Sequence, residues 1–114
     1  MKDIHGIAQL QNNIGIIYAN KSEFEKSLDH LLQSYENFEK IEDKRGMAAS
    51  LNGVGVIYHN MKEIKLALTN LNRSYELFKD INMKRGMAAS LNSIGSIYQE
   101  AGDFEMAFDY LTKS

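Results

Sequence analysis

Apolar residues recur along the chain at spacings of three and four, which is the period of a helix with one buried face. In the central third, one such stripe consists of Met47, Leu51, Val54 and Tyr58, and the next consists of Ile64, Ala67, Leu68, Leu71, Tyr75, Phe78 and Ile81. We therefore predict a helix from near Lys44 to about Asn60, a short connection over 61–63, and a second helix that carries the longer stripe. The carboxylate of Asp43 is expected to cap the first helix by accepting from its free amides.

The pattern repeats at a fixed offset of 40 residues. The segment KRGMAASLN at 44–52 returns unchanged at 84–92, and a Gly-x-Ile-Tyr sequence stands at 15–18, 55–58 and 95–98. A fixed period of about 20–50 residues is typical of stacked repeats. Two amphipathic helices joined by a tight turn form an antiparallel hairpin. The chain is thus predicted to be one all-α solenoid over 1–114, with three hairpins at about 3–42, 43–82 and 83–114, the last of them truncated.

Glycines recur at two phases of the first helix of each unit. Glycine inside a helix costs about 1 kcal/mol relative to alanine, so its recurrence mid-helix predicts a close approach of two backbones. The mid-helix glycines are Gly15, Gly55 and Gly95, and the small residues expected to face them are Ser27, Ala67 and Ala107. A second set, Gly6, Gly46 and Gly86, lies near the start of the helix, and the sequence offers no reason for it.

Composition argues against several classes of function. The chain has no Cys and no Pro, and its net charge is −2, without the basic excess usual in nucleic-acid-binding proteins. It lacks both an apolar run long enough to cross a membrane and the apolar core of a signal peptide. We expect a cytoplasmic protein that binds neither nucleic acid nor membrane.

Candidate chemistry is weak. His5, His30 and His59 do not have the spacing of a metal site, and no Gly-rich phosphate-binding loop is present. Ser22, Ser50 and Ser90 have no recognisable histidine and acid partners. We expect no catalytic residue, no metal and no cofactor, and hence a protein that is not an enzyme.

The repeated residues resemble the tetratricopeptide repeat, whose first helix carries apolar residues, Gly and Tyr, and whose second carries Ala. The matching residues are Leu51, Val54, Gly55, Tyr58 and Ala67 in the middle unit, and Leu91, Ile94, Gly95, Tyr98 and Ala107 in the third. Gln11 and Ser27 depart from the pattern in the first unit, and the family's frequent Trp is absent. The period of 40 exceeds the family's usual length of about 34. It is similar to that of long-period members such as kinesin light chains, cell-polarity adaptors and bacterial sensory arrays.

The resemblance implies a right-handed superhelix whose concave face, lined by the first helices, contacts an extended peptide. The residues expected there are Gln9, Asn12 and Asn20 in the first unit, Arg45, Asn52, His59 and Asn60 in the second, and Arg85, Asn92 and Gln99 in the third. The asparagines form one rung per repeat, and their amides both donate and accept. Arg45 and Arg85 favour an acidic partner because guanidinium binds carboxylate in a fork.

Two alternatives remain for these residues. Near-identical repeats share residues after a recent duplication whatever their role, and the arginines could be surface charges paired with Glu39, Glu42 or Asp80. The preferred function is a protein- or peptide-binding scaffold. The alternative is a regulatory or dimerising array of a larger bacterial signalling protein, fused to an output domain such as a histidine kinase or nucleotide cyclase. The apolar, uncapped C-terminal unit also suggests self-association through that end.

Overall fold

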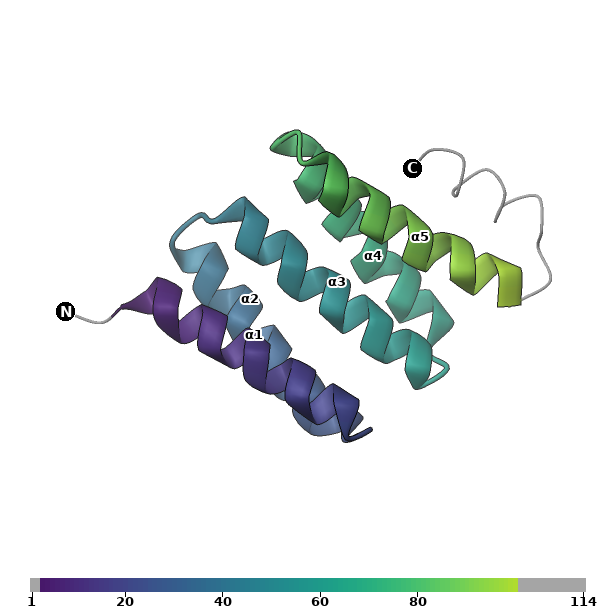
Figure 1. The fold of residues 1–114 in the computed structure, drawn as a ribbon, viewed down its shortest axis with the longest axis horizontal. Coiled ribbons are helices and arrows are strands. Elements are labelled where there is room, and N and C mark those ends of the chain that lie inside the picture. The colour runs from purple at the N-terminus through teal and green to yellow at the C-terminus, as the bar shows by residue number, and fades with distance from the viewer. Residues whose placement is uncertain (1–2, 101–114) are drawn as a thin grey trace.

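The computed structural model describes residues 3–100, and within them every regular element is a helix. Five helices of 17 residues follow one another: α1 (Ile4–Asn20), α2 (Phe24–Lys40), α3 (Lys44–Asn60), α4 (Ile64–Asp80) and α5 (Lys84–Glu100). Equivalent helices begin 40 residues apart, as in α1, α3 and α5 (Figure 1). The helical solenoid expected from the sequence is therefore confirmed, and the second helix of the third hairpin lies outside the described residues.

Helices α1 and α3, each the first helix of its repeat, begin directly after an aspartate that caps them. The Asp43 carboxylate accepts from the amide of Gly46 at 3.0 Å, and Asp3 does the same for Gly6. The predicted bounds of α3, Lys44 and Asn60, are confirmed. Helix α4 begins at Ile64, the first residue of its predicted stripe, and ends at Asp80, so Ile81 lies at the C-cap just outside the helix. Ile64 and Ile81, the two ends of the stripe, are exposed.

Each of the four helices from α1 to α4 ends in the same three-residue turn. After α3, the amide of Glu63 donates to Tyr58 O at 2.9 Å and that of Lys62 donates to His59 O at 3.0 Å. This pair of bonds defines a Schellman motif, whose second turn residue adopts a left-handed conformation. Lys62 has a φ of 67°. The equivalent residues of the other turns are Ser22, Glu42 and Asn82, also with positive φ.

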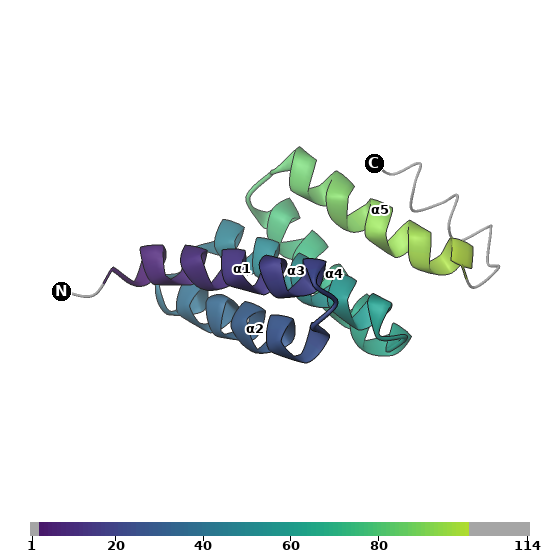
Figure 2. The same cartoon turned by 60° about the horizontal axis from the view of Figure 1, so that its bottom comes forward.

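The helices form two layers. The first helices α1, α3 and α5 lie side by side, and α2 and α4 lie behind them; Figure 2 shows α2 beneath α1. Cα atoms of α1 and α3 approach within 8 Å, as do those of α3 and α5, whereas those of α2 and α4 do not. The layer of first helices is therefore the inner side of the curved stack. No helix within residues 3–100 is long and apolar enough to cross a membrane.

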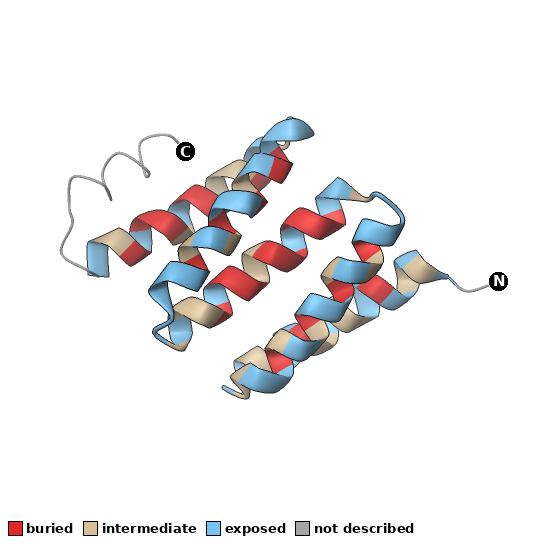
Figure 3. Cartoon of the chain, turned by 180° about the vertical axis from the view of Figure 1, so that it is seen from behind, coloured by how far each residue is buried: buried red, intermediate tan, exposed pale blue. Residues whose placement is uncertain are grey.

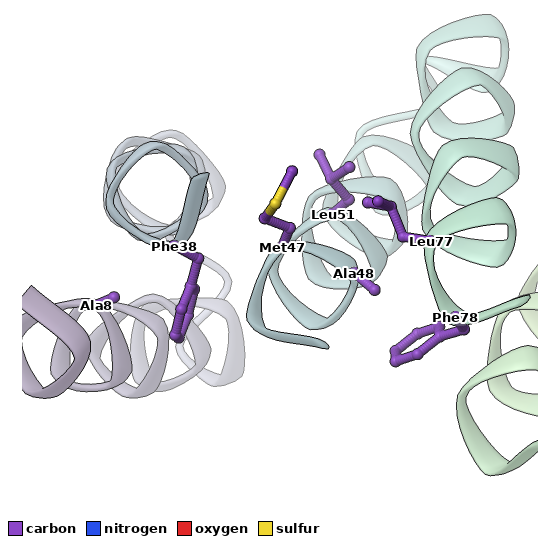
Figure 4. Packing of buried hydrophobic residues seen from close by; sticks show 7 residues of the cluster. All are labelled: Ala8, Phe38, Met47, Ala48, Leu51, Leu77 and Phe78. Carbon is purple, nitrogen blue, oxygen red and sulfur yellow. The ribbon is translucent and has the colours of Figure 1, made fainter. Parts of the chain in front are cut away.

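The core crosses the boundary between repeats. Its largest cluster draws on α1, α2, α3 and α4 and consists of Ala8, Phe38, Met47, Ala48, Leu51, Leu77 and Phe78 (Figure 4). Smaller clusters join α2 to α3 through Leu31, Val54 and Ile57, and α4 to α5 through Ala67, Leu71, Ile94 and Ile97. Helix α3 lies between two neighbours and carries buried residues along its whole length (Figure 3).

The mid-helix glycines are sites of close approach, as predicted. A Cβ atom at position 55 would lie 2.5 Å from Leu71 Cγ and 3.2 Å from the carbonyl oxygen of Ala67. Gly15 stands in the same relation to Leu31 and Ser27, at 2.7 and 3.2 Å. Ala107, the expected partner of Gly95, lies outside the described residues.

The structure supplies the reason for Gly46 and Gly86 that the sequence lacks. A Cβ atom at position 46 would lie 2.2 Å from Cδ1 of Phe38, and one at position 86 would lie 2.2 Å from Cδ1 of Phe78. The ring that ends one repeat therefore lies directly on the helix that begins the next.

Buried serines link the helices at each repeat boundary. Ser74 Oγ donates to Ala48 O at 2.7 Å and lies 3.2 Å from Ser90 Oγ. Ser34 makes the same contacts with Ala8 O at 2.6 Å and Ser50 Oγ at 3.1 Å. All four hydroxyls are inaccessible to solvent, so they serve packing.

Candidate functional site

All the residues predicted for the binding surface lie on the inner layer, on the sides of α1, α3 and α5 that the core leaves uncovered. We call this surface the groove face. Each of these residues is exposed or half-buried: Gln9, Asn12, Asn20, Arg45, Asn52, His59, Asn60, Arg85, Asn92 and Gln99. The same helical period that buries one side of α1, α3 and α5 leaves this side exposed or half-buried.

A groove of about 640 Å³ lies between α1 and α3. Its lining residues are His5, Gln9, Asn12, Asn13, Phe38, Asp43, Arg45, Gly46 and Ala49. Gln9, Asn12 and Arg45 are predicted site residues that the structure brings together here. Phe38 reaches the groove from α2 because Gly46 leaves room for its ring, and the His5 ring packs edge-on against it with centroids 5.9 Å apart.

In this groove the acidic side chain of Asp43 has partners within the fold, whereas the basic side chain of Arg45 has none among the described residues. Asp43 Oδ1 accepts from the amide of Gly46, and Asp43 Oδ2 lies 3.5 Å from His5 Nε2. Among the described residues, neither Arg45 nor Arg85 has an ion pair or hydrogen bond through its guanidinium. Asp80, one of the acids suggested as an arginine partner, instead pairs with Lys44 at 3.6 Å. The arginines therefore remain available to an external acid.

An outer-layer arginine shows the contrast. Arg73 Nη2 donates to the hydroxyl of Tyr35 at 3.4 Å, and this hydrogen bond raises the pKa of Arg73. Arg73 is thus engaged within the fold, across the gap between α2 and α4.

Asn52 is the central rung of the asparagine row. Its side-chain oxygen Oδ1 is buried and has no hydrogen-bond partner. Asn12 lines the groove, and Asn92 is exposed on α5. A buried acceptor without a donor is uncommon in folded proteins, so Asn52 is the residue of this row that packing explains least.

The far end of the groove face is bridged within the fold. His59 Nε2 on α3 pairs with Glu100 Oε2 on α5. The two residues line a hollow of about 350 Å³ with Lys62, Ile64 and Ile97. Of the predicted site residues, His59 therefore contacts the next repeat. Arg85, Asn20, Asn60 and Gln99 are exposed and line neither hollow.

Sequence reasoning missed three contributors. Asp43 was assigned only a capping role, Phe38 only a core role, and Glu100 no role. A signal for Phe38 exists in the recurrence of Phe38 and Phe78 eight residues before Gly46 and Gly86. Within residues 3–100, no group of three or more His, Asp and Glu side chains is placed to hold a metal ion.

Comparisons with known proteins agree with the helical repeat fold. The family model of the tetratricopeptide repeat matches residues 6–80 and again 47–114, and no curated protein matches the sequence. The TPR domain of Arabidopsis FLU has a similar structure, with a TM-score of 0.88 at 16% identity over 96% of this chain and 92% of that one. BtubC (BKLC) from P. vanneervenii has a TM-score of 0.82 at 20% identity over 93% of this chain. The match spans 44% of the BtubC chain, and identities this low show the fold alone.

Tetratricopeptide repeats generally mediate protein–protein interaction and are generally not catalytic. The two matches to the family model overlap and together extend from residue 6 to residue 114. The chain therefore belongs to the tetratricopeptide repeat family.

Proposed function

We propose that this chain is a scaffold module that holds an extended peptide segment of a partner protein along the groove face. The segment would run across α1, α3 and α5, because the asparagine and arginine positions recur once per repeat in that direction. An extended peptide exposes backbone amides and carbonyls along its length, and a row of side-chain amides offers both a donor and an acceptor at every step.

The observation that carries this proposal is the unpartnered Oδ1 of Asn52. Leaving such an acceptor unsatisfied costs roughly 1–3 kcal/mol. Rotation of the Asn52 side chain toward the groove would let a peptide amide satisfy it. Binding would then recover a hydrogen bond that the free protein lacks.

The charge distribution supports an acidic segment. The guanidinium groups of Arg45 and Arg85 are exposed and have no partner among the described residues. Asp43, the acid of the groove between α1 and α3, already faces His5 and the first turn of α3. A carboxylate of the partner would meet a free guanidinium, in a bond stronger than one between neutral groups.

The test is selection of random 12-residue peptides displayed on phage, followed by fluorescence anisotropy with the synthetic peptides. We expect selected peptides rich in Asp and Glu. Their affinity should fall roughly tenfold or more when Asn12, Asn52 and Asn92 are changed to alanine together, equal to a loss of about 1.4 kcal/mol. The control carries the same chemical change on α4, Asn70→Ala with Asn72→Ala, and should bind like wild type.

Equal binding by the groove variant and the control would refute the groove as the binding surface. Failure to select any peptide would favour the alternative, a regulatory or dimerising array of a larger signalling protein in which the groove stays empty.

A further inference from the structure

Helix α1 has an apolar face that no described element covers. The face consists of Ile7, Leu10, Ile14 and Ile17, at spacings of three, four and three, and we call it the α1 stripe. The exposed fractions of Ile7, Leu10 and Ile17 are 41%, 60% and 53%, and Ile14 is half-buried. Figure 1 shows α1 at one end of the stack of helices.

The other repeats show that this position is a helix-packing face. Its equivalents in α3 are Met47, Ser50, Val54 and Ile57, and all four are buried. Val54 and Ile57 pack against Leu31 of α2, and Ser50 pairs with Ser34 of α2. In α5 the equivalent face packs on α4 in the same way, through Ile94 and Ile97. The internal interfaces therefore indicate that a helix belongs on the α1 stripe.

That helix is not expected to be another copy of α2 or α4. Ser50 and Ser90 lie within 3.1 and 3.2 Å of serines on the helices that cover them. Leu10 occupies this position in α1. Leucine neither hydrogen-bonds to a serine nor fits the space between two serine hydroxyls, so the α1 stripe requires a wholly apolar partner.

The α1 stripe is complementary to a second copy of itself. Its spacing is symmetric about its centre, so a second α1 placed antiparallel brings Ile7 opposite Ile17 of the second copy, and Leu10 opposite Ile14 of the second copy. The next positions at the same spacing are Asp3 and Lys21, which cap the two ends of α1. The same two-fold arrangement places Asp3 opposite Lys21 of the second copy, at both ends. Within Ile4–Asn20 there is no Asp, Glu, Lys or Arg, so no like charges meet along the contact.

We propose that the α1 stripe binds the α1 stripe of a second copy of this chain, forming a two-fold symmetric, antiparallel helix pair. Such a contact is isologous, so it closes at the dimer. The α1 stripe lies roughly 140° around the helix from Gln9, Asn12 and the other groove positions, at about 100° per residue. The groove face of each copy therefore stays open in the dimer.

The first test is sedimentation equilibrium of the 114-residue chain at concentrations up to about 100 µM, beside Leu10→Glu. Wild type is expected to be dimeric and the variant monomeric. Its dissociation constant should rise by roughly a hundredfold or more, because each dimer loses two buried leucines. Leu66→Glu on α4 is the matched control, since Leu66 is 44% exposed and away from α1, and it should dimerise like wild type. Circular dichroism checks that each variant remains helical.

The second test addresses the two-fold pairing. Ile7→Glu and Ile17→Lys should each be monomeric alone, whereas an equimolar mixture should form heterodimers, because one Glu–Lys pair and one Ile–Ile pair then face each other. A monomeric wild type would show that another helix covers the α1 stripe and would overturn the proposal. Dimerisation of Leu10→Glu would place the contact elsewhere, including the C-terminal end. A mixture that stays monomeric would refute the antiparallel register.

Discussion

Asn52 combines two properties that rarely coincide in a residue kept only for stability. It sits in the middle of the inner layer, and its buried side-chain oxygen has no partner. Asn also forms helices less readily than Ala. On both counts Asn52 weakens the folded chain, which favours a role in binding.

The first prediction follows from the expected loss of folding stability at Asn52. Asn52→Ala should raise the free energy of unfolding by about 1 kcal/mol, because it removes an unsatisfied acceptor and gains helix propensity. Urea denaturation followed by circular dichroism measures the change. The control is Asn37→Ala, which deletes the 2.7 Å bond from Asn37 Nδ2 to Gln11 Oε1 and should bring no gain. A loss of stability in Asn52→Ala would show that the amide supports the fold.

At the scale of the elements, each turn from α1 to α5 has a residue other than glycine at its second position, where glycine is commonest. The left-handed conformation costs an L-residue about 1 kcal/mol or more, and glycine avoids this cost. Lys62 adopts it in the turn from α3 to α4, and its side chain is exposed.

We predict that Lys62→Gly raises the free energy of unfolding by about 0.5–1 kcal/mol, since the relief of strain exceeds the added freedom of the unfolded chain. Glu76→Gly on the exposed side of α4 is the matched control, and it should lower stability by about 1 kcal/mol. Thermal and urea unfolding of both variants measure these changes. If Lys62→Gly also destabilised the chain, the turn would not be strained.

Close packing of the two helices in a hairpin yields the next prediction. Gly55→Leu should lower the free energy of unfolding by about 3 kcal/mol, because Leu71 and the carbonyl of Ala67 leave no room for a side chain. Gly53 is the control on the same helix, where the nearest atom to an added Cβ is the tip of Leu31 at 3.3 Å. Gly53→Ala should be neutral or slightly stabilising in urea denaturation. A change below about 0.5 kcal/mol for Gly55→Leu would rule out the close contact.

For the whole molecule, the two layers differ in how their arginine side chains are paired. The outer arginine Arg73 bonds to Tyr35, whereas the inner arginines Arg45 and Arg85 are unpaired among the described residues. Arg45 also lines the groove of about 640 Å³ between α1 and α3. On the groove face, Arg45 thus combines a guanidinium that is unpaired within residues 3–100 with an adjoining hollow.

Changing Arg45 and Arg85 together to Glu should weaken an acidic peptide at least roughly tenfold and leave the thermal midpoint nearly unchanged, because exposed charges contribute little to stability. Anisotropy titrations with the selected peptides, repeated at high salt, measure the effect. Added salt should weaken peptide binding by the wild type and reduce the difference in affinity between wild type and the double variant, since surface charges are screened. Unchanged affinity would show that the arginines do not contact the peptide, and the proposed binding surface would then depend on the asparagine row alone.

Local sequence was sufficient for the helices and their order. The stripe from Met47 to Tyr58 at three-and-four spacing and the carboxylate of Asp43 specify α3 from start to end. The 40-residue repeat transfers that prediction to α1 and α5 without further information. Such features are local because periodicity and capping act within one helix.

Tertiary structure decided which residues from different helices meet at the groove face. Phe38 and Asp43 join one groove with Arg45 only because α2, the turn after it and α3 converge beside α1. His59 meets Glu100, 41 residues away, and Asn52 Oδ1 is buried in the folded chain without a hydrogen-bond partner. Repetition predicts which residues are equivalent. It does not predict that Leu10 is exposed where Ser50 is buried, because burial depends on the neighbouring helix, which differs between equivalent positions.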